Sequence, residues 1–288
     1  WAEMNENSDL VHFILGSKAE TLRRIQPKLK KSKVCDQITL TWSIWTKNAK
    51  HAVEKIQSKF ADQRLIIRSS SIEEDGWETA NAGVFESILN IECNDSEAVR
   101  EAIDNVFSSY GELPSHSQVL IQPFIGDVAM SGVLFTCDLI TGAPYYIINY
   151  DDTSGRTDSI TSGQTSDLRT IIVFHHEISS ILSIDSRLGK VVDAAKELEQ
   201  LLGYNKLDIE FAIDNDGQCF TFQIRPIAVS HSSYQIDEKN FFLHLQDAQQ
   251  KFKSWQQKPP HILGKYTVFS GMTDWNPAEI IGTRPNAL

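Results

Sequence analysis

The sequence has 288 residues, 41% of them hydrophobic, so one large domain or two small domains can form around buried cores. Its formal net charge of -11 argues against a nucleic-acid-binding face, because phosphate binding needs concentrated lysine and arginine. Lysines do cluster between Gln26 and Trp42, in a pattern typical of a solvated face. We therefore expect a globular protein that does not bind nucleic acid.

The cysteines and the apolar runs indicate a cytoplasmic protein. The four cysteines are far apart and form no CxxC pair, which argues against a zinc knuckle and a dense disulfide framework. No run approaches the roughly 20 apolar residues of a membrane span, and the acidic, polar start is unlike a signal peptide. We expect reduced thiols and no membrane partner. Because the chain begins with Trp rather than Met, we expect a processed or incomplete start.

The first half of the chain mixes helical and strand patterns. The apolar run from Leu65 to Ile67 indicates a buried strand, which delivers Arg68 and three serines to its C-terminal end, where ligands commonly bind. The other predicted elements are a helical pattern over 14–31, a strand over 34–42, a helix over 45–60, a strand over 82–91 and a helix over 96–111 with Ser96 as its N-cap.

The second half begins with strands and ends with a helix and a tail. Its predicted elements are strands over 118–125, 130–138 and 144–152, a polar loop over 151–167, a strand that includes His175 and His176, a helix over 191–203 closed by Gly203, a hairpin over 207–227 with its turn at Asn215–Gly217, a helix over 241–255 and an extended tail. A structural role is expected for the two histidines.

The hairpin over 207–227 is the most informative segment for chemistry. Its alternation places Asp208 and Glu210 on one strand and Gln223 and Arg225 on the other, so all four side chains can share one face. Carboxylate and amide oxygens suit magnesium, and an arginine suits a transferring phosphoryl group. A surface hairpin with a cross-strand Glu-Arg pair is the alternative interpretation.

A lysine at a turn, Lys18, is the second candidate for a phosphate contact. Gly16 and Ser17 precede it, and a helical pattern follows, so its charge and the helix N-terminus would both favour a phosphate. The sequence contains no GxxxxGK[ST], which excludes a P-loop. Turn lysines are common, so this feature needs support from others.

Five segments in order resemble the N-terminal ATP-grasp domain of the pyruvate phosphate dikinase and phosphoenolpyruvate synthase family, which includes the rifampicin phosphotransferases. They are Gly16-Ser17-Lys18, IIRSSS at 66–71 followed by Glu74-Asp75, NAGVFESILNI at 81–91, SGVLFTCD at 131–138 and DIEFAIDNDGQCFTFQIRPI at 208–227. The tail sequence FSGMTDWNPAEIIGTRP resembles a linker in dikinase-like proteins of surface-polysaccharide gene sets, among them the glutamine kinases.

The resemblance implies an α+β ATP-grasp fold, with two mixed α/β subdomains and the nucleotide cleft between them. We expect an N-terminal subdomain over 1–115, a C-terminal subdomain with the metal-site hairpin over 116–228, and a linker over 229–288 toward missing downstream domains. In such enzymes a swivelling phosphohistidine domain and an acceptor domain follow. The chain is therefore expected to be only the ATP-binding part of a longer phosphotransferase.

The resemblance also assigns roles to residues. Lys18, Arg68 and Arg225 would be the catalytic residues: the first two would contact nucleotide phosphates, and Arg225 would be the family's catalytic arginine. Glu210 and Gln223 would bind the metal. Asp208 is the weaker candidate, because it could instead support the metal ligands. The nucleotide-binding set implied by the family is Lys18, Arg68, Gln122 beside the adenine pocket, Thr136, Asp208, Glu210, Gln223 and Arg225.

The implied reaction is dikinase-type phosphoryl transfer. Mg²⁺-ATP, with Mn²⁺ as an alternative, would give its β-phosphoryl group to a histidine of the swivelling domain, with AMP and phosphate as products. The phosphohistidine would then phosphorylate a small acceptor, either pyruvate-like or a glutamine amide in a capsule pathway. An ATP-grasp ligase that forms ADP, a silent nucleotide-binding regulatory module and a plain scaffold domain remain open.

The chain departs from the family pattern at three places. The Gly-rich segment expected after the third central strand is replaced by the polar stretch 151–167, which contains Asp151, Asp152 and Arg156. A phosphate-covering loop of altered chemistry and a solvated loop are equally favoured there. Tyr110 is followed by Gly111, where the family commonly has arginine, so one phosphate contact is in doubt. A serine also replaces the second glycine of the family's opening turn.

Overall fold

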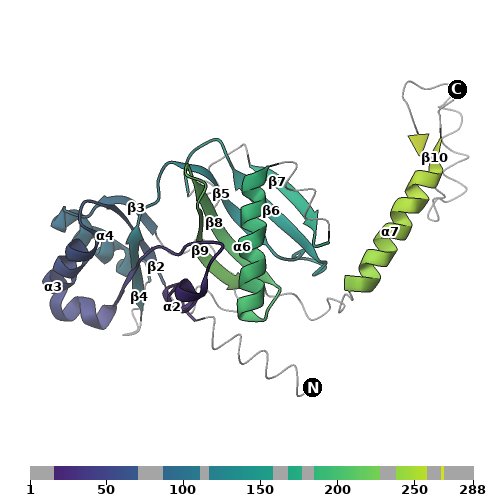
Figure 1. Ribbon diagram of the computed structural model, residues 1–288. Coiled ribbons are helices and arrows are strands. Elements are labelled where there is room, and N and C mark those ends of the chain that lie inside the picture. Colours follow the sequence, from purple (N-terminus) through teal and green to yellow (C-terminus); the bar gives the residue numbers. More distant parts are fainter. Residues whose placement is uncertain are drawn as a thin grey trace, which may run out of the picture. The chain divides into compact units, whose positions relative to one another are not determined.

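The structure is a computed structural model that describes residues 16–70, 87–110, 117–157, 168–176, 185–227, 238–257 and 267–268 (Figure 1). The chain divides into two compact units, 1–234 and 235–288. The first unit contains two antiparallel sheets and the helices that pack on them, so the expected mixed α/β class with two sheet-containing parts is confirmed. Glu74, Asp75 and the start of the NAGVFESILNI segment lie outside the described residues.

The first sheet has four antiparallel strands in the order β1-β4-β2-β3. These are β1 (Ile38–Thr41), β4 (Gln118–Pro123), β2 (Arg64–Ser69) and β3 (Ser87–Glu92). Helices α3 (Trp42–Phe60) and α4 (Ser96–Ser108) bury their apolar faces against one side of the sheet, where Ile56, Ile67 and Ile103 belong to one core. The opposite side of β2 and β4 carries Arg68 and Gln122.

The second sheet has five antiparallel strands in the order β7-β6-β5-β8-β9. These are β7 (Arg169–Phe174), β6 (Tyr145–Asp151), β5 (Val128–Phe135), β8 (Leu207–Asp214) and β9 (Cys219–Pro226). Helix α6 (Ser186–Leu202) lies across this sheet (Figure 1) and buries residues such as Leu198 in a core with Leu134 and Ile209. The other face of β8 is left for polar side chains.

The first described helix, α2 (Lys18–Ile25), packs into the core of the second sheet. Its apolar side chains Ala19, Leu22 and Ile25 belong to the same cluster as β8 and β9. A 3-10 turn, η1 (Gln26–Lys28), follows, and Lys33 then pairs with the edge of β9 through two backbone hydrogen bonds of 2.9 Å. The start of the chain therefore completes a sheet whose strands come much later.

Sheet membership does not follow the predicted division at 115/116. Strand β4 was assigned to the C-terminal subdomain, yet it pairs with β1 and β2 in the first sheet, and α2 was assigned to the N-terminal subdomain, yet it packs with the second sheet. The predicted subdomain limits, 1–115 and 116–228, remain a prediction. The second unit contains α7 (Glu238–Trp255), which corresponds to the helix predicted over 241–255. It also contains two short strands that the sequence did not predict, β10 (Gln256–Gln257) and β11 (Thr267–Val268).

Several predicted ends differ from the observed ones. The cap of α4 is Asp95 rather than Ser96, because the Asp95 carboxylate accepts hydrogen bonds from the amides of Glu97 (3.1 Å) and Ala98 (3.0 Å). Helix α6 begins at Ser186, five residues earlier than predicted, and ends as predicted at Gly203, which has φ 63°. Strand β7 ends at Phe174, so both histidines that follow lie in a turn.

The structure also bears on membrane association. None of the helices in the described ranges combines the length and the apolar character that a membrane crossing requires.

The four cysteines, Cys35, Cys93, Cys137 and Cys219, are all buried free thiols.

Candidate active site

The hairpin of β8 and β9 places four polar residues on one face of the second sheet. Glu210 lies directly opposite Gln223, and Asp208 lies directly opposite Arg225. Ile209 and Ile224 point to the other face, into the core with α6. The two-residue period that was read from the sequence therefore gives the shared face that was predicted.

An ion pair joins this face to the first sheet. The Nη2 atom of Arg68, at the end of β2, donates to Oε2 of Glu210 across 3.0 Å. The Arg68 side chain is 11% exposed and that of Glu210 is 19% exposed, so both charges are largely removed from water. Water screens the attraction between charges less at this depth than at the surface, and loss of one partner leaves an uncompensated charge.

Lys18 is the third charged residue of this cluster. It is the first residue of α2 and is only 4% exposed, although lysine is almost never fully buried unless it is paired. Its charge acts on Glu210, and so does that of Arg225. Three cations from α2, β2 and β9 thus converge on one carboxylate of β8.

The charge state of Glu210 follows from these neighbours. Burial alone would raise its pKa, but the positive charges of Arg68, Lys18 and Arg225 and the hydrogen bond from Arg68 outweigh burial. The pKa of Glu210 therefore lies below its ordinary value of 4.5, and the carboxylate is ionised at neutral pH. Lys18, Arg68 and Arg225 outnumber the two carboxylates of this face, those of Asp208 and Glu210, and an excess of cations suits a polyanionic ligand.

Comparison with known protein families gives a match to a nucleotide-binding domain. The family model described as "Pyruvate phosphate dikinase, AMP/ATP-binding domain" matches residues 19–151. Over this stretch, the resemblance to the dikinase family is confirmed. The match includes Arg68, Gln122 and Thr136, whereas Lys18 and the β8–β9 hairpin lie outside it.

Two of the solved structures that this chain resembles are ligases of low sequence identity. The D-alanine-D-alanine ligase of Helicobacter pylori is 16% identical, with a TM-score of 0.42 over 79% of this chain and 56% of that chain. The corresponding ligase of Coxiella burnetii is 10% identical, with a TM-score of 0.44 over 84% of this chain and 61% of that chain. These likenesses are too weak to bear on activity, and this chain spans little more than half of either ligase. No curated protein matches the sequence.

Gln122 lies in the dikinase-matched stretch beside the charged cluster. It is 2% exposed, and among the described residues its Nε2 atom has no hydrogen-bond partner. The Nε atom of Arg68 is likewise buried without a partner in that part of the chain. Buried donors of this kind cost free energy unless something accepts from them. A bound ligand with acceptor atoms would satisfy both.

Thr136, another member of the predicted set, is committed to the fold. Its hydroxyl donates to the carbonyl of Asn205 (2.8 Å) and accepts from the amide of Leu207 (2.7 Å), which fixes the start of β8 against the end of β5. The side chain is fully buried. These contacts explain the threonine without a ligand, so its predicted nucleotide contact receives no support from the structure.

The predicted metal ligands fit a divalent cation in their chemistry. Magnesium is commonly held by one or two carboxylates together with substrate phosphates. Glu210 supplies an ionised carboxylate, and the buried Gln223 supplies an amide oxygen from the adjacent position on β9. Within the described ranges, no group of three or more His, Cys, Asp or Glu side chains is placed to hold a metal by protein ligands alone.

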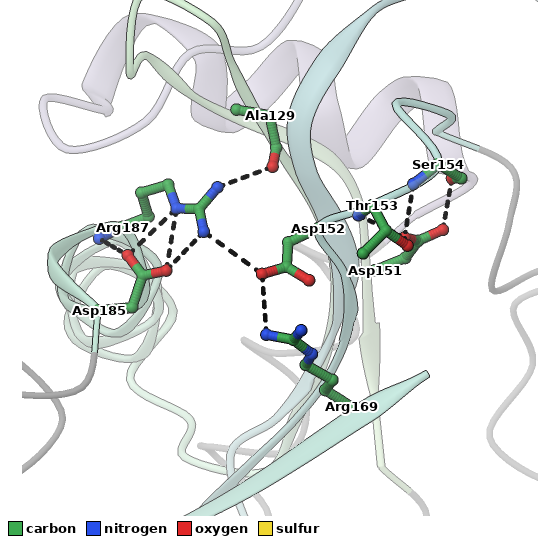
Figure 2. A network of polar contacts seen from close by, with 8 residues as sticks. All are labelled: Ala129, Asp151, Asp152, Thr153, Ser154, Arg169, Asp185 and Arg187. Atoms are coloured by element: carbon green, nitrogen blue, oxygen red, sulfur yellow. Dashed lines mark hydrogen bonds and ion pairs between the residues drawn. The ribbon is translucent and has the colours of Figure 1, made fainter. Parts of the chain in front are cut away.

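The acidic residues of the 151–157 segment are engaged in structural contacts (Figure 2). The Asp151 carboxylate accepts from the amides of Thr153 (2.9 Å) and Ser154 (3.0 Å), which closes the turn after β6. Asp152 lies between Arg187 (3.4 Å) and Arg169 (3.2 Å). These contacts account for both acids as supports of the strand end. The remainder of the predicted loop, 158–167, lies outside the described residues.

Arg187 is the residue of this network that sequence reasoning missed. Its guanidinium contacts Asp185 (2.6 Å) and donates to the carbonyl of Ala129 (2.9 Å), so it ties the start of α6 to β5 (Figure 2). The hydrogen bond from Arg187 holds the pKa of Asp185 below its ordinary value, although burial acts against it. The sequence shows Asp185 two residues before Arg187 near the predicted helix. This pattern is too common to indicate a contact network.

Proposed function

We propose that the chain is the ATP-binding domain of a dikinase-type phosphotransferase. It would bind Mg²⁺-ATP and pass the β-phosphoryl group to a histidine on a separate domain of the same longer protein. AMP would be released from one side of that group, and water would take the γ-phosphoryl group as phosphate. The observation that carries the proposal is the convergence of Lys18, Arg68 and Arg225 on the ionised Glu210. A cluster built from α2, two sheets and three cations suits the phosphates of a nucleotide.

Each residue has a role that its placement supports. Lys18 and Arg68 would hold the nucleotide phosphates, and Arg225 would stabilise charge that develops during transfer. Glu210 and Gln223 would hold the metal, with Asp208 beside them, and the bound metal would neutralise phosphate charge. Gln122 would donate a hydrogen bond from Nε2 to the nucleotide beside the adenine pocket. Most of the catalytic effect would come from positioning the reacting groups and stabilising the charge on the phosphates, since the residues of this domain form no covalent bond to the phosphoryl group in the proposed reaction.

The final acceptor is chosen elsewhere in the proposed enzyme. A pyruvate-like molecule or a glutamine amide is the proposed class, with transfer from the phosphohistidine rather than directly from ATP. A ligase would instead keep the adenosine as ADP, because it transfers the γ-phosphoryl group. The nucleotide product therefore separates the two activities.

The first experiment is calorimetric titration of the chain with ATP, with and without magnesium. Magnesium-dependent binding supports the proposal, whereas absence of binding in both conditions contradicts it. The second experiment supplies the longer protein with ATP and separates the nucleotides by chromatography. AMP is the expected product, and ADP would replace the proposed reaction with that of a ligase.

A further inference from the structure

The hydroxyl of Tyr110 joins two strands of the first sheet at their ends nearest to the charged cluster. It accepts a hydrogen bond from the amide of Ser70 (2.7 Å) and donates to the carbonyl of Gln118. The Tyr110 ring packs against Phe107, with ring centroids 6.4 Å apart, so helix α4 fixes its position. Ser70 is two residues beyond Arg68, and Gln118 begins β4.

The two residues that Tyr110 contacts each hold a neighbour of Lys18. The Ser70 hydroxyl accepts from the amide of Ala19 (3.0 Å), one of the helix N-terminal amides that lack a partner within the helix. The hydroxyl of Ser17 lies 3.3 Å from Oε1 of Gln118 and donates to it. The residues before and after Lys18 are therefore both attached to the first sheet.

These contacts hold the turn of backbone that carries Lys18. Helix α2 packs with the second sheet, but its first turn is held by the first sheet through Ser70 and Gln118. Lys18 stands between the two attachments and is 4% exposed, so a small shift of this turn would move its charge within a buried cluster. At short range in a poorly hydrated site, such a shift changes the interaction with a phosphate strongly.

We propose that Tyr110 is a positioning residue for Lys18 and, through it, for the phosphates of a bound nucleotide. This inference rests on the proposed function and extends it. The tyrosine hydroxyl fixes Ser70 and Gln118, and they fix the turn that carries the lysine. Tyr110 thereby contributes to phosphate binding without touching the ligand, at a place where the family's neighbouring arginine is replaced by Gly111.

The test is Tyr110→Phe, which removes one hydroxyl and keeps the ring against Phe107. The Ser70 amide retains the Gln118 carbonyl at 3.0 Å, so β2 and β4 stay paired. We expect ATP affinity to fall about fivefold to tenfold, a change about as large as the net contribution of one hydrogen bond, while adenosine affinity stays within about twofold. A general loss of structure would weaken ATP and adenosine equally and would overturn the inference.

Lys18→Ala provides the decisive comparison. If Tyr110 acts through Lys18, adding Tyr110→Phe to Lys18→Ala should weaken ATP binding by less than about twofold, because the positioned charge is already absent. Additive losses would overturn the inference. Tyr146→Phe is the matched control, since its buried hydroxyl donates to Glu199 (2.8 Å) in the core of the second sheet. It should leave the ratio of ATP to adenosine affinity unchanged.

Amide hydrogen exchange tests the same arrangement without nucleotide. In Tyr110→Phe, the amide of Ala19 should exchange faster than in the wild type, whereas amides in the middle of α6 should not change. Unchanged exchange at Ala19 would overturn the positioning role. If the wild-type chain bound no ATP, the proposed function would fail, but the exchange experiment would still decide whether Tyr110 holds the turn that carries Lys18.

Discussion

Glu210 shows how one side chain depends on three others for its charge. Burial opposes ionisation, and Arg68, Lys18 and Arg225 together reverse that effect. The carboxylate is therefore ionised at neutral pH, and one of its oxygens is bonded to Arg68. A nucleotide that brings a metal and phosphates would offer new partners to both members of this pair.

Glu210→Gln should remove the magnesium dependence of ATP binding while preserving the fold. Glutamine keeps the shape of the side chain and an oxygen that Arg68 can contact, but it lacks the negative charge that holds a divalent cation. Calorimetry with and without magnesium measures the effect. Glu92→Gln is the control, because Glu92 forms an exposed ion pair with Arg64 in the first sheet. Retained magnesium dependence in Glu210→Gln would exclude Glu210 from the metal site.

The same residue predicts a pH dependence of stability. Because the pKa of Glu210 is lower in the folded protein, its ionisation stabilises the fold above the ordinary value of 4.5, and this contribution is lost as pH falls through the lower folded value. The difference in unfolding free energy between wild type and Glu210→Gln should therefore be largest near neutral pH and shrink below about pH 4.5. Urea unfolding at a series of pH values measures it. A constant difference would contradict the predicted shift.

At the scale of elements, β5 is the centre of the second sheet, and its glycine explains part of the SGV segment. A Cβ atom added to Gly132 would meet the carbonyl oxygen of Asn149 at 2.5 Å and the ring of Phe211 at 2.6 Å. Gly132 pairs with Tyr150 on one side and Phe211 on the other, so neither strand can retreat easily. Close packing, rather than a turn, requires glycine here.

Gly132→Ala should lower the free energy of unfolding by about 1–3 kcal/mol, the usual cost of overpacking. Thermal or urea unfolding measures the change. Gly203→Ala is the comparison, because a Cβ there meets nothing within 4 Å and only the left-handed backbone opposes it. If Gly132→Ala unfolds like the wild type, β5 and its neighbours are packed less closely than described.

Which features could be predicted from the sequence depends on how local they are. The period of two in β8 and β9 is local, so it correctly placed Glu210 beside Gln223. The pair of Arg68 with Glu210 spans 142 residues, and only resemblance to a family suggested that they meet. The pairing of β4 with β1 and β2 in the first sheet could not be predicted for the same reason, since the apolar pattern of a strand does not indicate which strand it pairs with. Asp95 and Ser96 are both good caps, and only backbone geometry separates them.

At the scale of the whole molecule, the two units have separate internal contacts. The charged cluster and both large sheets lie within residues 16–227, inside the first unit. The family match also ends at residue 151, within that unit. The named residues of the candidate site therefore all belong to the first unit.

A chain shortened to end at Tyr234 should keep its unfolding midpoint and its ATP affinity, because the cores of both sheets are retained. Thermal unfolding and calorimetry of the shortened and full chains measure both quantities. Affinities within about twofold of each other are expected, since every named residue of the candidate site is retained. A large loss of ATP affinity would show that the second unit takes part in nucleotide binding.

The position of α2 has a consequence for the order in which the protein forms during synthesis. The segment after α2 pairs with β9, and the contact of Ser32 with Thr221 spans 189 residues. Domains generally begin to fold as they leave the ribosome, at about 5–20 residues per second. Lys18 emerges early but must wait for the last hairpin before it reaches Glu210. We expect the first sheet to form before the β8–β9 hairpin has been synthesised. The candidate nucleotide site should therefore be complete only after that hairpin has folded.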